Sequence, residues 1–253
     1  MLETLTGQST GTITLVAAAA ALAAAIKGTL GFGFPPVATP LIAGIIGAKT
    51  AVVALAIPGL LQNIAQAWSG RVHVKRCRPL LPLLAALVVG SLGGAYLLTV
   101  LPAHLAMMLV GVAVVVYALL AMFRLEPTLP PTWAGPIGVG VGLVAGLLGG
   151  ATGIFAPLLV LYLTAVRLDK EQFTAVISIA FFVGQVPQIA GYAGLGLFTA
   201  DRLLLSAVMI PPVAVGFALG TAVRSWMSQR VFVVVVQLAL FMIGIRLVLE
   251  AMK

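Results

Sequence analysis

Long apolar runs, separated by short polar stretches, recur from one end of the chain to the other. Runs of about 17 to 25 residues are long enough to cross about 30 Å of hydrocarbon as α-helices. The pattern therefore predicts an all-α membrane protein. The expected helical segments are Thr12–Ile26, Pro36–Ile46, Thr50–Trp68, Pro79–Val100, Ala103–Phe123, Pro136–Leu148, Ile154–Val166, Glu171–Ala193, Asp201–Val223 and Arg230–Ala251. The second and the seventh are too short to span a bilayer, and each follows a glycine-rich break.

The two breaks indicate an internal repeat. Gly28–Gly33, followed by Pro40-Leu41, resembles Gly146–Gly150, followed by Pro157-Leu158. Further matches keep the same order: Asn63-Ile64-Ala65 with Gln188-Ile189-Ala190, and Gly90 and Gly94 with Gly216 and Gly220. We predict two homologous halves of four to five helical segments each, residues 1–125 and 135–253, with a proline-containing linker at 126–134.

The cations between the apolar runs bear on how the halves are oriented. If every segment crosses the membrane, the basic stretches at Arg71–Arg78, Arg124, Arg167 and Arg224 fall on one side, as the positive-inside rule requires. If each glycine-broken pair crossed only once, the halves would be parallel and the last two stretches would change sides. The charge count therefore favours inverted repeats. Whether the two short segments cross or re-enter stays open.

Composition supports lipid as the main solvent. The 253 residues are 62% hydrophobic and 8% charged, too few polar residues to cover a soluble fold. The net charge of +8 would raise nucleic acid as a partner, but the cations read as membrane anchors, so the bilayer is expected and nucleic acid is not. Cys77 is the single cysteine, which excludes a disulfide framework and a thiol redox centre. Only Glu3 is charged before the first run, so a cleaved signal peptide is not expected.

The glycine breaks are candidate anion sites. Pro35 and Pro36 are suited to the first turn of a helix, so a helix is expected to begin there inside the membrane. Such an N-terminus carries unpaired N–H groups and a positive partial charge, and two of them would form a cradle for an oxyanion. The alternative is that the glycines merely let helices pack closely. The candidate residues of the breaks are Gly31, Gly33, Phe34, Gly150, Thr152 and Gly153.

Lys27 lies within an apolar run, beside the first break. An uncompensated lysine at the centre of a membrane helix costs roughly 2.5 to 3.5 kcal/mol, so it is a functional candidate by default. The alternative is a lysine near a helix end that extends to the interface. Arg246, in the last run, is expected to reach the interface or to pair with Glu250 one turn away.

Uncharged polar side chains within the runs are further candidates. Amides can donate hydrogen bonds to an anion without adding a counter-charge, and hydroxyls contribute more weakly. The alternative is hydrogen bonding between helices, which is common for Asn and Gln in membrane bundles. The residues concerned are Thr39, Gln62, Asn63, Gln66, Gln185, Gln188 and Tyr192.

No carboxylate lies in the middle of any apolar run, since the acidic residues fall in loops or near segment ends. This argues against a carboxylate proton relay and against a cation site. His73 and His104 also fall in loops, and no nucleophile, base and orienting acid share a run. We therefore expect no metal, no cofactor and no enzymatic activity, and a small anion as the substrate.

With two halves, glycine-rich turns before Pro-Leu and a basic loop within the first half, the chain resembles the sulfite exporter TauE/SafE family over nearly its whole length. The resemblance implies a multi-pass permease of the bacterial inner membrane for sulfite, sulfonates or related organic anions. Phe32, Phe34 and Ala151-Thr152 depart from the family's usual glycines and leave the exact anion open.

Other functions and several properties also stay open. A permease for a carboxylate or an inorganic anion and a non-transporting membrane subunit of a complex are the alternatives. The sequence does not decide the direction of transport or the coupling ion. Small-residue pairs such as Gly90 with Gly94 would pack helices within one chain or between two copies in a homodimer.

Overall fold

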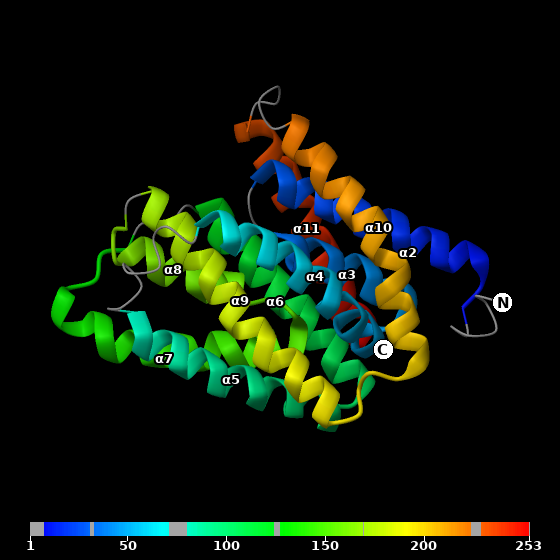
Figure 1. Cartoon of the computed structure of the whole chain (residues 1–253), viewed down its shortest axis with the longest axis horizontal. Coiled ribbons are helices and arrows are strands. Elements are labelled where there is room, and N and C mark those ends of the chain that lie inside the picture. The colour runs from blue at the N-terminus through cyan, green and yellow to red at the C-terminus, as the bar shows by residue number, and fades with distance from the viewer. Residues whose placement is uncertain are drawn as a thin grey trace.

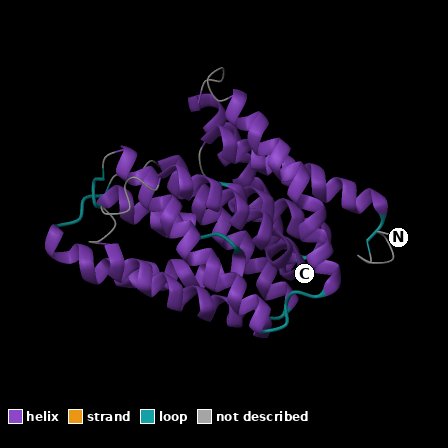
Figure 2. Ribbon diagram, in the orientation of Figure 1, coloured by secondary structure: helices purple, strands orange, loops and turns teal. Residues whose placement is uncertain are grey.

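The computed structural model describes residues 8–30, 33–70, 80–123, 127–168, 170–223 and 229–252. Within these ranges the chain is helical and contains no strands (Figure 2). The helices are α2 (Thr10–Leu30), α3 (Phe34–Ile46), α4 (Ala48–Gly70), α5 (Leu81–Val100), α6 (Ala103–Phe123), α7 (Pro131–Thr152), α8 (Ala156–Ala165), α9 (Lys170–Gly194), α10 (Ala200–Val223) and α11 (Gln229–Ala251).

Seven of the described helices are long and apolar enough to cross a membrane, whereas α3 and α8 are shorter apolar helices. The prediction of an all-α membrane protein with two short helices is therefore confirmed. Large apolar side chains such as Val89, Phe123 and Met242 are exposed on the outside of the bundle. In a membrane such side chains face lipid, so their exposure carries no penalty.

Two helices extend four or five residues beyond a predicted end. α2 continues to Leu30, beyond the expected end at Ile26, and so includes Lys27 and Gly28. α7 begins at Pro131, inside the stretch expected as linker, because proline has no N–H to lose in a first helical turn. Only residues 127–130 of the predicted linker lie outside helices among those described there.

Glycine contacts hold the principal helix pairs together. In Figure 1, α5 lies beside α7, and α2 lies beside α10. A Cβ on Gly94 would lie 2.2 Å from the carbonyl oxygen of Leu147, and one on Gly220 would lie 2.0 Å from that of Ala25. Backbone approaches this close admit no side chain, as at small-residue interfaces in membranes. The small-residue pairs therefore pack helices within one chain.

α4 and α9, which the predicted repeat would make counterparts, run in opposite directions. Leu87 and Ala95 of α5 contact Gly184 and Gly191 of α9 in the same order, so α5 and α9 are parallel. α4 and α5 run in opposite directions in Figure 1, and Lys49 Nζ at the start of α4 donates to the carbonyl of Thr99 at the end of α5 (3.0 Å). Hence α4 and its proposed counterpart α9 are antiparallel. Their directions agree with inverted halves; the repeat itself stays a prediction.

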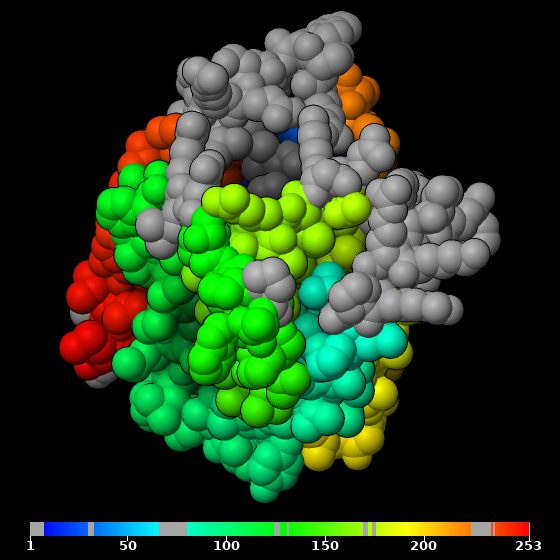
Figure 3. All heavy atoms as spheres, turned by 90° about the vertical axis from the view of Figure 1, so that its left-hand side faces the viewer, coloured from blue at the N-terminus to red at the C-terminus, as the bar shows by residue number. Residues whose placement is uncertain are grey.

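The second glycine-broken pair folds back on itself. Tyr162 in α8 donates through its hydroxyl to the carbonyl of Ala134 near the start of α7 (2.9 Å), and the N–H of Leu129 donates to the carbonyl of Ala165. Figure 3 shows this end of the molecule, where α7 and α8 lie close to the beginning of α5. α7 and α8 therefore form a hairpin and do not make a single interrupted span.

A proline within α4 leaves a carbonyl group that another helix satisfies. Pro58 in α4 has no N–H, so the carbonyl of Ala54 lacks its usual helical partner. The hydroxyl of Ser206 in α10 donates to that carbonyl at 2.6 Å. A hydrogen bond from a neighbouring helix is the means by which a membrane helix tolerates proline.

Candidate functional site

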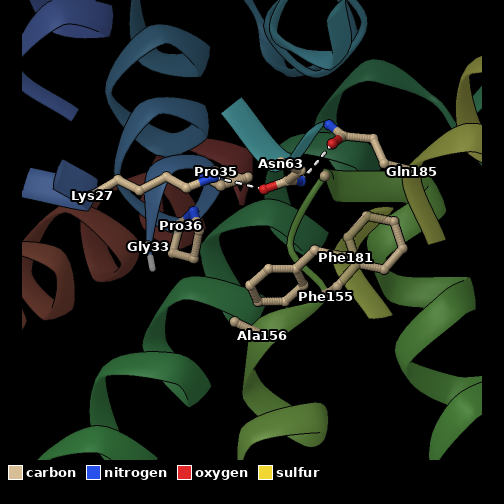
Figure 4. A pocket seen from close by; sticks show the side chains of 10 residues that line it. Lys27, Gly33, Pro35, Pro36, Asn63, Phe155, Ala156, Phe181 and Gln185 are labelled. Atoms are coloured by element: carbon tan, nitrogen blue, oxygen red, sulfur yellow. Dashed lines mark hydrogen bonds between the residues drawn. The ribbon is translucent and has the colours of Figure 1, made fainter. Parts of the chain in front are cut away.

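The two glycine breaks meet inside the bundle. Gly33 precedes α3 with a φ of 104°, and Gly153 follows α7 with a φ of 77°, both left-handed conformations that favour glycine. A Cβ on Gly153 would lie 3.8 Å from Cβ of Pro35. Both breaks line one cavity (Figure 4). Its lining residues are Lys27, Gly33, Pro35, Pro36, Asn63, Gly153, Phe155, Ala156, Phe181 and Gln185.

The two helix N-termini at the cavity differ in the hydrogen-bond donors that they offer. Pro35 and Pro36 have no N–H, so the first turn of α3 retains only those of Gly33 and Phe34. In the second break, Phe155 and Ala156 carry N–H groups for which the described residues provide no acceptor. Both ends bring positive partial charge to the cavity. Of these four residues that carry an N–H group, Gly33, Phe155 and Ala156 line the cavity, so two of the three belong to the start of α8.

Lys27 points into the protein. Its side chain is 2% exposed, and Nζ donates to Oδ1 of Asn63 in α4 at 2.6 Å. The geometry therefore differs from that of a lysine extending to the interface. An ammonium has three N–H groups, of which this bond uses one. No acidic residue contacts Lys27 among the described residues, so its partner there is neutral.

Asn63 and Gln185 connect α4 with α9 beside Lys27. Nδ2 of Asn63 donates to Oε1 of Gln185 at 2.7 Å, and Nε2 of Gln185 donates to the carbonyl of Ala56 at 3.1 Å. Both side chains are buried and line the cavity. These two amides were candidates for the anion site. They form the hydrogen bonds between helices that the sequence analysis gave as the alternative.

Two aromatic rings form the opposite wall of the cavity, and the sequence analysis did not single them out. Phe155 directly precedes α8, and Phe181 lies one turn before Gln185 in α9 (Figure 4). The ring of Phe155 occupies a slot between two helices, because a Cβ on Gly149 or Gly184 would collide with it. Apolar residues resemble any lipid-facing or core position in sequence. The glycine partners of the ring were the only available signal.

Buried polar atoms without a partner lie near the site. Thr39 Oγ1 is buried, has no hydrogen-bond partner among the described residues, and lies 3.6 Å from a Cβ built on Gly153. Both polar atoms of Gln62 are likewise buried and unpartnered in the described structure. Unpaired buried polar groups are costly, so their presence beside a cavity favours a ligand. Neither Thr39 nor Gln62 is among the cavity-lining residues, but Thr39 is next to Gly153, which is.

Gln188 and Tyr192 belong to α9 and contact the end of α7. Neither lines the cavity. Nε2 of Gln188 donates to the carbonyl of Gly149 at 2.9 Å, and the hydroxyl of Tyr192 donates to that of Gly150. Thr152 Oγ1 donates to Leu148 and accepts the N–H of Ile154. These side chains satisfy backbone groups at the break, so their contacts are with the protein.

Of the remaining candidate residues, some pack against other helices, and others lie outside the described part of the chain. Phe34 is fully buried and does not line the cavity. Gly150 packs against α5, where a Cβ would lie 2.3 Å from the carbonyl of Ser91. Gly31, the side chain of Gln66 and the basic stretch at 71–78 lie outside the described residues.

The acidic side chains that the structure describes lie away from the cavity. Asp201 is in the first turn of α10, and Glu250 is near the end of α11. Glu250 Oε1 is 2.8 Å from Nε of Arg246, which confirms the expected pair. No group of three or more metal-binding side chains occurs in the described part of the chain. The charge that the described residues bring to the cavity is therefore positive.

A comparison with protein families matches residues 16–247 to the family described as Sulfite exporter TauE/SafE. The chain belongs to this family. Membership implies a membrane transporter of sulfite-type anions, and with the apolar helices it makes this TauE/SafE protein a multi-pass membrane protein. No curated protein and no solved structure matches the chain significantly.

Proposed function

We propose that this TauE/SafE protein is a secondary permease that moves a small oxyanion, sulfite or an organosulfonate, across the bacterial inner membrane. The observation that carries the proposal is Lys27, a buried lysine at the cavity whose described partner is a neutral amide. A buried cation without a counter-charge is costly, and an anionic substrate would remove that cost.

The anion would bind between Lys27 and the start of α8. Two N–H groups of the ammonium remain after the bond to Asn63, and Phe155 and Ala156, whose N–H groups have no acceptor among the described residues, line the cavity. Charge-assisted hydrogen bonds of this kind contribute about 1.5 to 3 kcal/mol each. Together they would replace part of the hydration that the anion loses on entering the membrane.

Transport requires the cavity to widen. It has room for little beyond a water-sized group, and a sulfite or sulfonate ion is larger. The lining comes from helices of both predicted halves, with α3 and α8 meeting at the breaks. A small displacement of one half relative to the other would open the cavity toward one side of the membrane, as in alternating access.

Flux into proteoliposomes tests the proposal. Purified protein is reconstituted, and uptake of labelled sulfite, an alkylsulfonate, a carboxylate of similar size and sulfate is followed. Saturable flux of sulfite or the sulfonate is expected. Preference for the carboxylate or for sulfate would shift the substrate class, and absence of flux and of ligand-induced thermal stabilisation for every anion would favour a non-transporting subunit.

Lys27 variants connect the flux to the site. Lys27→Gln removes the charge and is expected to weaken anion affinity by about one to two powers of ten, because a charged hydrogen-bond donor is lost. Lys27→Arg keeps the charge and should lose less. Equal affinity in the parent and both variants would remove Lys27 from substrate binding.

A further inference from the structure

The hydrogen bonds around Lys27 fix the orientation of two amides. An ammonium can only donate, so Asn63 presents Oδ1 to Lys27 and Nδ2 to Gln185. At the other end, the carbonyl of Ala56 can only accept, so Gln185 presents Nε2 to it and Oε1 to Asn63. The ammonium at one end of this chain of hydrogen bonds and the Ala56 carbonyl at the other therefore require the same orientation of both amides. Figure 4 shows the part that joins Lys27, Asn63 and Gln185. The acceptor facing Lys27 is thereby specified by residues of α4 and α9.

The same bonds limit what the amides can offer to a substrate. One N–H of Asn63 is used by Gln185, and one N–H of Gln185 is used by Ala56. Lys27 by contrast uses one of three N–H groups in its bond to Asn63. The ammonium is therefore the group at this wall with the larger unused donor capacity, and the amides hold it in place.

The chemical type of residue 63 also sets the charge of the site. An aspartate has nearly the shape of asparagine and would accept the same hydrogen bond from Lys27, but it would pair the ammonium with a carboxylate. With asparagine, the acceptor is neutral and the cation keeps its full charge for the cavity. Asparagine therefore fixes the position of the ammonium without neutralising it.

We infer that Asn63 and Gln185 are positioning residues that hold the Lys27 ammonium at the cavity without a counter-charge, and that Asn63 thereby makes the site selective for anions. The inference rests on the proposed function and deepens it. It assigns these amides a role through Lys27, whereas the sequence analysis left open whether they donate to the anion or form hydrogen bonds between helices.

Two substitutions at Asn63 separate positioning from packing. Asn63→Asp is expected to lower sulfite or sulfonate affinity by about a hundredfold or more, because an internal ion pair would replace the substrate's interaction. Asn63→Leu removes the acceptor but leaves the charge of Lys27, and should lower affinity by only about tenfold. Anion affinity should therefore be highest with asparagine at position 63, lower with leucine and lowest with aspartate.

Thermal unfolding of the same purified variants should give a different order. Asn63→Asp can form an ion pair with Lys27 and is expected to unfold near the parent temperature, whereas Asn63→Leu leaves Lys27 without its acceptor and should unfold lower. A purely structural role for Asn63 predicts that affinity follows stability, with Asp milder than Leu. That result would overturn the inference.

Gln185→Leu tests the second positioning residue. Without Oε1 to accept from Nδ2, the Asn63 amide can rotate and turn its donor toward the ammonium. We expect KM for flux to rise by about five- to tenfold, with little change in the maximal rate. A fall in the maximal rate at unchanged KM would contradict a role in positioning Lys27.

The outcomes distinguish this inference from the proposed function. If the parent carries no anion, the proposed function fails and the inference fails with it. If the parent transports an anion and Lys27→Gln weakens its binding, but Asn63→Asp binds like the parent, only the inference fails.

Discussion

Thr39 in α3 and Gly153 at the end of α7 are neighbours across the junction of the two glycine breaks: a Cβ at position 153 would lie 3.6 Å from Thr39 Oγ1. The hydroxyl is buried and has no partner in the described structure. The contact therefore brings an unused donor next to the backbone that begins α8.

Alanine at Gly33 or Gly153 is expected to reduce anion affinity by at least about tenfold. Both glycines have a positive φ, so a side chain strains the backbone that shapes the cavity. Gly47 and Gly196 are matched controls, since they also have a positive φ but a Cβ there meets no atom within 4 Å. Affinity is measured by titration of purified, monodisperse protein. Equal losses at site and control positions would attribute the effect to backbone strain alone.

Thr39→Val should weaken anion binding by about five- to tenfold while leaving thermal stability unchanged or higher. Valine has a similar shape and removes a buried hydroxyl that has no partner in the described structure, so the folded protein loses no hydrogen bond. Thr39→Ser keeps the hydroxyl and serves as the control for binding. The prediction fails if Thr39→Val binds sulfite or a sulfonate as tightly as the parent.

Gly94→Val is expected to abolish correct folding. Its Cβ would lie 2.2 Å from the carbonyl oxygen of Leu147, so α5 and α7 would have to separate. The adjacent Gly93 is the control, because a Cβ there meets only the Cδ1 atom of Leu147 at 3.4 Å. Size-exclusion profiles in detergent and thermal unfolding provide the comparison. A monodisperse Gly94→Val protein of parental stability would rule out the close helix contact.

The connections between α4 and α5 and between α9 and α10 should lie on opposite sides of the membrane. The native Cys77 belongs to the first connection, and Thr199→Cys in a Cys77→Ser background reports on the second. We expect an impermeant thiol reagent to reach Cys77 from the cytoplasm and residue 199 from the other side, since α4 and α9 are antiparallel. Labelling of both from the same side would exclude inverted halves.

The helices were predictable because apolar runs and breakers determine them directly. The short α3 and α8 follow from Pro35-Pro36 and from the glycines before Pro157, which end one helix and start another. The extension of α2 through Gly28 was not predictable, because it depends on α10: a Cβ on Gly28 would lie 2.4 Å from the carbonyl of Phe217. A single sequence does not reveal such a partner.

The polar residues of the candidate site were predictable from the sequence, but the aromatic residues that line the cavity were not. Lys27, Asn63 and Gln185 stand out because polar side chains are rare within apolar runs, and the structure brings all three together. Gln188 was equally conspicuous in the sequence, but its side chain donates to the carbonyl of Gly149 and does not line the cavity. Which way a side chain on α9 points is not evident from the sequence. Phe155 carries no polar signal at all, although it lines the cavity.

The glycine contacts between α2 and α10 have a consequence for biogenesis. α2 is synthesised before α10, so the backbone at Ala21 and Ala25 is at first not covered by the glycines of α10 that contact it in the folded protein. α5 likewise precedes α7. The cavity at Lys27 is likewise complete only after Gln185 in α9 has been synthesised and has joined the bundle.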